Sequence, residues 1–578
     1  MQANEASTRT GLRRSDYAIA VAIAAVTFGL RLMFLFSGPD HAWPHSALYE
    51  GDAPTWARWA KSLAVGEAFE FDLPFRTPGV AWMLHFLHMG LHMDAAPYTS
   101  AKILWCAMSA ATGAALYLVL ARWFTRRAGL IATTLFALSF GSFALATSLN
   151  NETPYALLVV GIIGATLAWI DRPKLWIAVA LGAMHAIAML MRAEHMLLLA
   201  MLLGYGAWRM RGAGRARVAT QCAVLVATML AVCAPWTLRG HAAAHRFNTE
   251  PLQEIPYDAA KPPWTPAAIA AFESLPAYAR ASNYAFLSDI GRRAGVQSID
   301  VQDVQRFFAK EWGSTPEPIS EWSLISIKGP LDFALANQPA SDGGFTRSGL
   351  SDTHGVNPPF SFARPTHANL LVHGYEIGLV SIRSDPTRWL GQVGEKLLRF
   401  QDGATVGLFA SDWPYTQHLL RRPVDVAVPL RWNAIGWLVL VLGSLAAGVV
   451  VACRRPGGLI LLVVVAYKLA VTVAFYGYAR QAMSISPVLF ALSALAVDAA
   501  CIAIARRVTL KPDAVFGLRM ATGIMVAAAV AFAAFEAWNP PLLVIKSLQP
   551  TPSITPQPEW GEGAFETMDT LAFMPHTK

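Results

Sequence analysis

The chain has 578 residues, of which 54% are hydrophobic and only 15% are charged. This composition excludes a soluble globular protein and is typical of a polytopic membrane protein. The net charge of +8 would suggest a nucleic-acid partner in a soluble chain, but the lysines and arginines are gathered in short breaks between hydrophobic blocks. We therefore interpret the charge as a topology signal and expect no nucleic-acid partner.

The first hydrophobic block, Tyr17–Phe36, has Arg31 as its only charged residue and is long enough to cross a bilayer. It lacks a small-residue cleavage site, so we expect it to remain as an anchor. Placing the basic breaks on the cytoplasmic side predicts an N-terminus inside, a C-terminus outside and about 11 spanning helices. The predicted spans are 17–36, 101–120, 128–147, 153–170, 175–191, 194–208, 218–237, 433–452, 458–478, 484–505 and 515–537.

Two regions depart from simple spans. Gly79–Met93 is apolar but shorter than the roughly twenty residues that a perpendicular helix needs, so we expect an interfacial or re-entrant helix on the outer face. The blocks 175–191 and 194–208 are also short, which predicts a hairpin broken around Arg192 and Glu194.

These spans divide the chain into four parts. They are an N-terminal membrane module, 1–239, with a first outer loop at 37–100; a large mixed extracytoplasmic segment, 240–431; C-terminal membrane helices, 432–537; and an outer tail, 538–578. Helical spacing within the extracytoplasmic segment predicts one helix over Ser298–Trp312 and another opened by Asp385-Pro386. The second has Trp389, Val393 and Leu397 at four-residue spacing, so we expect this amphipathic face to rest on the membrane or on the helix bundle.

Charged residues at the outer ends of the helices are the candidate site. Such groups cost several kcal/mol at a membrane face unless they are paired or used. Arginines bind phosphate in bidentate geometry, and a carboxylate can take the proton of an attacking hydroxyl. The mixture therefore suits a substrate with a phosphate leaving group. The residues are Glu50, Asp52, Arg58, Arg76, Glu152, Arg192, Glu194, Arg239 and Arg480.

Six stretches in chain order resemble the membrane glycosyltransferases of the GT-C fold, in the branch of the dolichyl-phosphate-mannose protein mannosyltransferases and the lipid A aminoarabinose transferase. The region from about 245 to 370 matches nothing we can assign. The stretches are Gly51-Asp52 with Arg76-Thr77-Pro78-Gly79; Asn150-Asn151-Glu152-Thr153-Pro154; Leu190-Met191-Arg192-Ala193-Glu194; Ala234-Pro235-Trp236-Thr237-Leu238-Arg239; Gly374-Tyr375, Asp385-Pro386 and Lys396-Leu397-Leu398-Arg399-Phe400; and Arg480-Gln481-Ala482-Met483-Ser484-Ile485-Ser486-Pro487.

The resemblance implies an all-α polytopic bundle of GT-C type and a polyprenyl-phosphate-sugar donor used from the outer leaflet. It implies that Asp52 is the general base of an inverting displacement and that Arg76 meets the donor phosphate. We expect Arg192, Arg239 or Arg480 to help bind that phosphate, with Glu50, Glu152 and Glu194 as supporting acids. Two departures, Ala53 in place of a second acid and Thr77-Pro78 in place of Pro-Pro, leave the acceptor open.

Plainer interpretations of Asp52 stand beside this one. It could only cap the helix that starts near Pro54, since aspartate is a good N-cap and proline suits the first turn. Glu50 and Asp52 could bind a divalent cation, although two carboxylates alone are weak support for a metal. The long hydrophilic stretches contain no cysteine, so we expect neither a disulfide framework nor a cysteine-based metal site.

The other charged candidates also have structural alternatives. Glu152 could be an acid favoured by the dipole at a helix start. Arg192 and Glu194 could only neutralise each other, and Arg239 and Arg480 could be anchors at the membrane edge.

The sequence favours an inner-membrane glycosyltransferase that moves a sugar from a polyprenyl-phosphate carrier to an envelope acceptor, whether glycan, lipid or protein. No nucleotide-binding glycine loop is evident, which fits a lipid donor. A transporter or flippase for lipid-linked saccharides is the alternative outside enzymes, and it would show inverted repeats and charges near the midplane. A polysaccharide polymerase or ligase, using a lipid-diphosphate donor, is the second enzymatic alternative.

Overall fold

The computed structural model describes residues 11–37, 52–66, 69, 72–91, 98–249, 318–344, 365–405, 434–455 and 457–507. All regular secondary structure within these ranges is helical. Five helices are long and apolar enough to cross a membrane, and they begin at Arg14, Thr99, Glu152, Arg215 and Ser486. The predicted all-α, multi-pass architecture is therefore confirmed. The count of 11 spans is not, and the predicted elements at 298–312, 515–537 and 538–578 lie outside the described residues.

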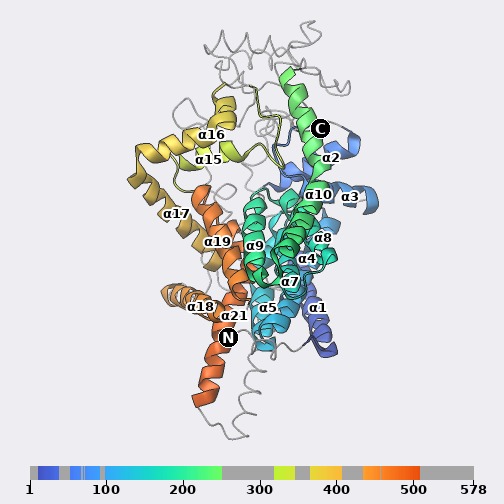
Figure 1. Cartoon of the computed structure of the whole chain (residues 1–578), viewed down its shortest axis with the longest axis vertical. Coiled ribbons are helices and arrows are strands. Elements are labelled where there is room, and N and C mark those ends of the chain that lie inside the picture. The colour runs from blue at the N-terminus through green and yellow to red at the C-terminus, as the bar shows by residue number, and fades with distance from the viewer. Residues whose placement is uncertain are drawn as a thin grey trace.

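The N-terminal helices follow the predicted blocks closely. The short helices α2 and α3 follow α1 and precede α4 in the sequence. Figure 1 shows them at the same end of the bundle as α15 and α16. The helices are α1 (Arg14–Ser37), α2 (Ala53–Val65), α3 (Gly79–Leu91), α4 (Thr99–Trp123), α5 (Arg126–Leu138), α6 (Phe140–Ala146), α7 (Glu152–Asp171), α8 (Leu175–Met191), α9 (His195–Arg209) and α10 (Arg215–Thr249).

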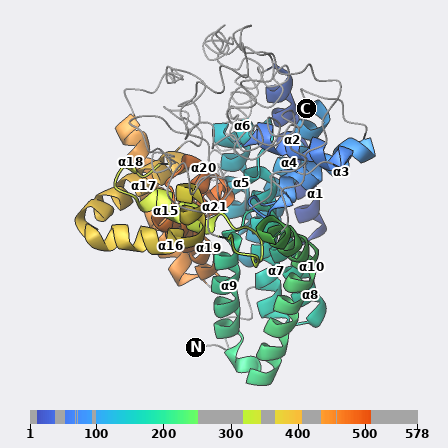
Figure 2. The same ribbon diagram turned by 90° about the horizontal axis from the view of Figure 1, so that it is seen from above.

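The later helices complete the bundle. Seen from above in Figure 2, α16, α17 and α18 lie on one side of the molecule and α1 and α3 on the other, with α5, α20 and α21 between them. They are α15 (Gly329–Asn337), α16 (Pro365–Ser384), α17 (Pro386–Thr405), α18 (Ala434–Arg454), α19 (Leu459–Ala474), α20 (Ala479–Met483) and α21 (Ser486–Arg507).

Close packing in the bundle depends on small residues. Helix α4 packs against α1, α5 and α7, while α8 packs against α10 and α18 against α21. At Gly182 a side chain would collide with the backbone of Leu225 on α10, and at Gly448 with the backbone of Leu492 on α21. Glycine lets these helices approach closely, which is how helices associate where lipid removes the hydrophobic driving force.

The predicted span 128–147 is wrong as a single helix, because it breaks at Ser139 into α5 and α6. The break leaves the last carbonyls of α5 without intrahelical partners. Arg31 from α1 supplies the donors: its Nη1 lies 2.8 Å from the carbonyl oxygen of Ala137 and its Nη2 3.0 Å from that of Phe136. The one charge in the first span thus stabilises a helix break.

One further prediction needs correction. Helix α10 continues to Thr249, past the predicted end of the span at 237, with Pro235 inside it. Helix α17 does begin after Asp385, whose Oδ1 accepts from the backbone N–H of Arg388 at 2.9 Å. Its face toward the bundle buries Gln392 and Lys396, and Trp389 on the same side bonds to Asn337, whereas Leu397 is exposed. The helix thus packs through polar as well as apolar side chains, and its contact with the membrane stays a prediction.

Candidate active site

Asp52 lies directly before α2, but its side chain makes no capping hydrogen bond. Its Oδ1 lies 3.5 Å from Nη1 of Arg76, and its Oδ2 lies 3.3 Å from Nη1 of Arg480. Residue 54 is a proline without an N–H, which removes one of the donors that a cap would use. Capping as the whole role of Asp52 is therefore wrong, since both oxygens face guanidinium groups.

The loop that carries Arg76 is docked on the end of α8. The Thr77 hydroxyl donates to the carbonyl of Met191 at 3.0 Å. A side chain at Gly79 would come within 2.8 Å of the carbonyl oxygen of Leu190, so only glycine permits this approach. The Thr-Pro-Gly sequence thereby holds Arg76 next to the break that contains Arg192.

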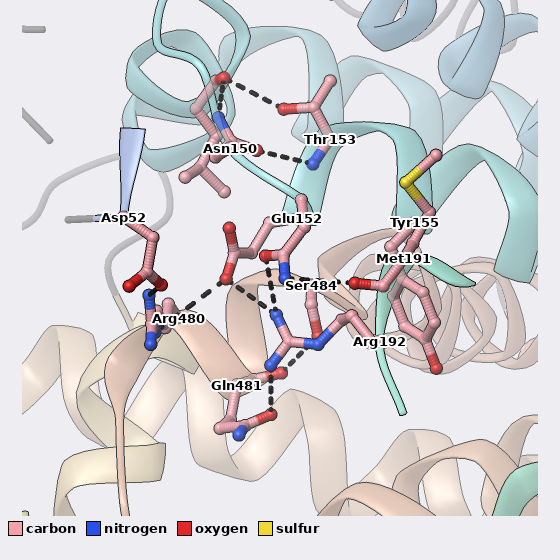
Figure 3. A network of polar contacts seen from close by, with 12 residues as sticks. Asp52, Asn150, Glu152, Thr153, Tyr155, Met191, Arg192, Arg480, Gln481 and Ser484 are labelled. Atoms are coloured by element: carbon pink, nitrogen blue, oxygen red, sulfur yellow. Dashed lines mark hydrogen bonds and ion pairs between the residues drawn. The ribbon is translucent and has the colours of Figure 1, made fainter. Parts of the chain in front are cut away.

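Arg192 occupies the predicted break between α8 and α9 and is the centre of a buried network (Figure 3). Its Nη1 donates to Glu152 Oε1 at 2.7 Å, and its Nε donates to Glu194 Oε1 at 2.6 Å. Its Nη2 donates to Gln481 Oε1 at 3.1 Å. Arg192 and Glu194 do pair, as the plainer interpretation expects, but as members of a larger network.

Glu152 connects this network to the Asp52 pair. It begins α7, where the helix dipole favours an acid. Its Oε1 lies 3.9 Å from Nε of Arg480, and Figure 3 shows the carboxylate between Arg480 and Arg192. Its Oε2 is buried without a hydrogen-bond partner. Five of the predicted residues beyond Asp52 therefore lie in one connected group: Arg76, Arg480, Glu152, Arg192 and Glu194.

Lys468 and Lys328 are residues that the sequence analysis missed. Lys468, fully buried on α19, donates from Nζ to Glu194 Oε1 at 3.1 Å and to Gln481 Oε1 at 2.8 Å. A lysine inside a membrane-spanning block is energetically costly unless it is paired. Its presence in the hydrophobic block of the sequence could therefore have identified it as a candidate. Lys328 pairs with Asp332 and acts electrostatically on Asp52 from the region that matched nothing. Burial raises the pKa of the Asp332 carboxyl.

Three predicted residues are not brought into the group by a described contact. Arg239 pairs with Asp72, Nη2 to Oδ1 at 2.6 Å, and so braces the loop four residues before Arg76. Glu50 lies outside the described residues, as does the side chain of Arg58. Within the described ranges, no group of three or more His, Cys, Asp or Glu side chains could hold a metal, so a divalent cation finds no support there.

The group combines guanidinium groups with carboxylates. Arg76, Arg192 and Arg480 contact Asp52, Glu152 and Glu194, and Lys468 contacts Glu194. Burial raises the pKa of the Asp52 carboxyl, but Arg480 and Arg76 outweigh it, and the pKa falls to about 2. Asp52 is therefore ionised at neutral pH and able to accept a proton.

Comparison with known families agrees with the predicted resemblance. Residues 75–238 match the family model for dolichyl-phosphate-mannose-protein mannosyltransferases. The resemblance is confirmed over this segment. It contains Arg76, Glu152, Arg192 and Glu194, but neither Asp52 nor Arg480.

Solved structures give weaker likenesses, and no curated protein matches the chain. The Archaeoglobus fulgidus oligosaccharyltransferase, crystallised with zinc and sulfate, is 12% identical with a TM-score of 0.40. That likeness covers 97% of this chain and 58% of the archaeal chain, so this chain spans little more than half of its length. ArnT from Cupriavidus metallidurans, bound to undecaprenyl phosphate, is 15% identical with a TM-score of 0.31 over 86% of this chain and 81% of that chain. At these TM-scores neither likeness assigns a metal or a lipid.

Proposed function

We propose that the protein is an inner-membrane glycosyltransferase that transfers a sugar from a polyprenyl-phosphate donor to an envelope acceptor with inversion at the anomeric carbon. The observation that carries the proposal is a carboxylate, Asp52, held between Arg76 and Arg480 at the edge of a buried network of arginines and carboxylates. The family match at residues 75–238 adds independent support.

The proposed displacement uses each of these groups once. The acceptor oxygen forms a bond to the anomeric carbon, and its proton goes to the Asp52 carboxylate. The bond from that carbon to the phosphate oxygen breaks, and the electron pair leaves with the polyprenyl phosphate. Arg76 and Arg480 stabilise the charge on this leaving group.

The geometry places two guanidinium groups beside the proposed base. Asp52 lies 3.5 Å from Arg76 and 3.3 Å from Arg480, so a phosphate bound next to this carboxylate would be within reach of both arginines. The tight bonds of Arg192 to Glu152 and Glu194 give it a supporting role behind them.

The basic breaks between hydrophobic blocks, set on the cytoplasmic side, support an outward-facing site and a cytoplasmic N-terminus. An outer-leaflet lipid donor would then reach Asp52 beside α2 and α3. The acceptor is the least constrained partner, because Glu50 lies outside the described residues.

The decisive experiment is a donor comparison with purified full-length protein. Synthetic polyprenyl-monophosphate, polyprenyl-diphosphate and nucleotide sugars are each offered with envelope extract, and release of the carrier is measured. We expect release from the monophosphate lipid only, with NMR showing inversion at the sugar. Release only from the diphosphate would indicate a polymerase or ligase. Movement of an intact lipid-linked sugar across vesicles without cleavage would indicate a flippase.

A further inference from the structure

The C-terminal end of α19 is held by side chains from two helices of the extracytoplasmic segment. The last carbonyls of a helix have no intrahelical partners. The Val473 carbonyl accepts from Lys396 Nζ at 3.1 Å, and the Ala474 carbonyl accepts from Asn337 Nδ2 at 2.9 Å. Lys396 belongs to α17 and Asn337 to α15, and both are fully buried.

Asn337 is the node that joins these elements. Its Oδ1 accepts from Lys396 Nζ at 3.0 Å and from Trp389 Nε1 at 3.1 Å. Its Nδ2 donates to the carbonyl of Phe333 as well as to α19, and its own carbonyl accepts from the Ser381 hydroxyl. The amide thus uses both N–H groups and both lone pairs, which fixes α15, α16, α17 and α19 relative to one another.

Lys396 is an unusual choice for this position. The described contacts of its ammonium are the Asn337 amide oxygen and a helix-end carbonyl. Burial lowers the pKa of Lys396 to about 8, so the group is still mostly charged at neutral pH. A buried charge costs several kcal/mol, and an apolar residue would fill the same volume, so packing alone does not account for a lysine here.

The segment after this node leads directly to the proposed site. Gly477 N–H donates to the Gly343 carbonyl at 2.8 Å, and Gly477 lies so close to the backbone of Lys396 that a side chain there would collide with it. Helix α20 begins two residues later and carries Arg480, which contacts Asp52. Contacts of residues 473–477 with the extracytoplasmic segment therefore help to position α20, together with its direct packing against α17 and the bonds of Gln481 to Arg192 and Lys468.

We infer that Asn337 and Lys396 are positioning residues of the active site: by fixing the end of α19 they aim α20, so that Arg480 reaches Asp52 and the donor phosphate. This inference rests on the proposed function. A positioning role differs from a role in stability alone. It requires that substitutions of Asn337 or Lys396 weaken phosphate binding only when Arg480 is present.

A double-mutant cycle tests that requirement. Lys396→Met keeps the aliphatic stem and removes the ammonium. The matched control is Arg399→Gln, which removes a cation from the same helix where it pairs with Asp342 at the surface, 2.8 Å away. Each variant is made in the wild-type and Arg480→Ala backgrounds. Equilibrium binding of undecaprenyl phosphate to the purified full chain is measured, together with the thermal unfolding midpoint.

We expect Lys396→Met to weaken binding roughly tenfold in the wild-type background and less than about twofold with Arg480→Ala, because residues that act through one group are not additive. Arg399→Gln should change binding in neither background. If Lys396→Met does not fold, Asn337→Asp takes its place in the cycle, since it keeps the acceptor for Lys396 and removes the donor to Ala474.

Two results would count against the inference, and they are distinguishable. If Lys396→Met weakens undecaprenyl phosphate binding by the same factor in both backgrounds, while the wild type binds normally, the positioning role alone is overturned. Absence of undecaprenyl phosphate binding by the folded wild-type protein would overturn the proposed function and this inference with it.

Discussion

Replacing Asp52 with asparagine separates chemistry from structure more cleanly than any other change in this protein. Asparagine keeps the shape of the side chain but cannot accept a proton at neutral pH. The structural loss should be small, because the Asp52 side chain is 35% exposed and its ion pairs are long. Partly exposed ion pairs of this length are worth on the order of 1 kcal/mol.

The expected kinetic loss is much larger. Removing a general base lowers the rate roughly 10²–10⁴-fold, which corresponds to about 2.7–5.4 kcal/mol of activation free energy. The assay is sugar transfer from a synthetic polyprenyl-phosphate donor by purified wild-type and Asp52→Asn proteins of equal thermal stability. The gap between the two magnitudes allows a catalytic effect to be told from a folding defect.

Asp72→Asn is the control for this experiment. Asp72 is also a loop carboxylate paired with an arginine, Arg239, but that pair is separate from Arg76 and Arg480. Its φ of +60° is one that asparagine tolerates well. We expect transfer by Asp72→Asn to stay within a few-fold of the wild type. If Asp52→Asn transfers sugar at the wild-type rate, Asp52 is not the base, and Glu152 becomes the next candidate.

Three further outcomes are expected. Arg76→Ala should weaken donor use by roughly 10²-fold while Arg76→Lys retains part of it, because lysine keeps the charge and loses the bidentate fork; normal donor KM and kcat in Arg76→Ala would transfer the phosphate contact to Arg480. The depressed pKa of Asp52, about 2, means that the base is ionised at every pH above that value, so kcat/KM should show no acid limb between about pH 5 and pH 8; a limb with an apparent pKa of about 6 would indicate a different base. In a cysteine-free background, an impermeant thiol reagent should label Asp342→Cys in intact cells and leave Arg215→Cys unlabelled, and the reverse pattern would invert the proposed topology.

The predictable parts of the structure are those with a local sequence signal, such as charged residues within an apolar stretch or a dipeptide typical of a helix start. Arg192 and Glu194 interrupt an apolar stretch, and the structure ends α8 at Met191 and begins α9 at His195. Asp385-Pro386 has the chemistry of a helix start, and α17 begins there. Local patterns of this kind need no knowledge of the partners.

What could not be predicted depends on distant partners. The apolar pattern runs through Ser139 without interruption, and the break there is stabilised by Arg31 more than a hundred residues earlier. Spacing on α17 identified Trp389 but not Lys396, because both side chains bond to Asn337, which lies about fifty residues earlier in the sequence and has no local signal on α17. In the sequence, Lys468 is one charge in a long hydrophobic block. Its partners are distant or on another helix: Glu194 lies in the break before α9, and Gln481 lies on α20.

The Arg31 contact also has a consequence for how the chain is assembled. An arginine in a spanning helix costs up to roughly 3 kcal/mol when the helix enters the bilayer alone. Helix α1 is synthesised well before α5, so at that moment Arg31 lacks the Phe136 and Ala137 carbonyls that later receive it. The apolar remainder of α1 must therefore carry the insertion. Arg31 has its full set of partners, which includes Ser109 on α4, only after both α4 and α5 have been made.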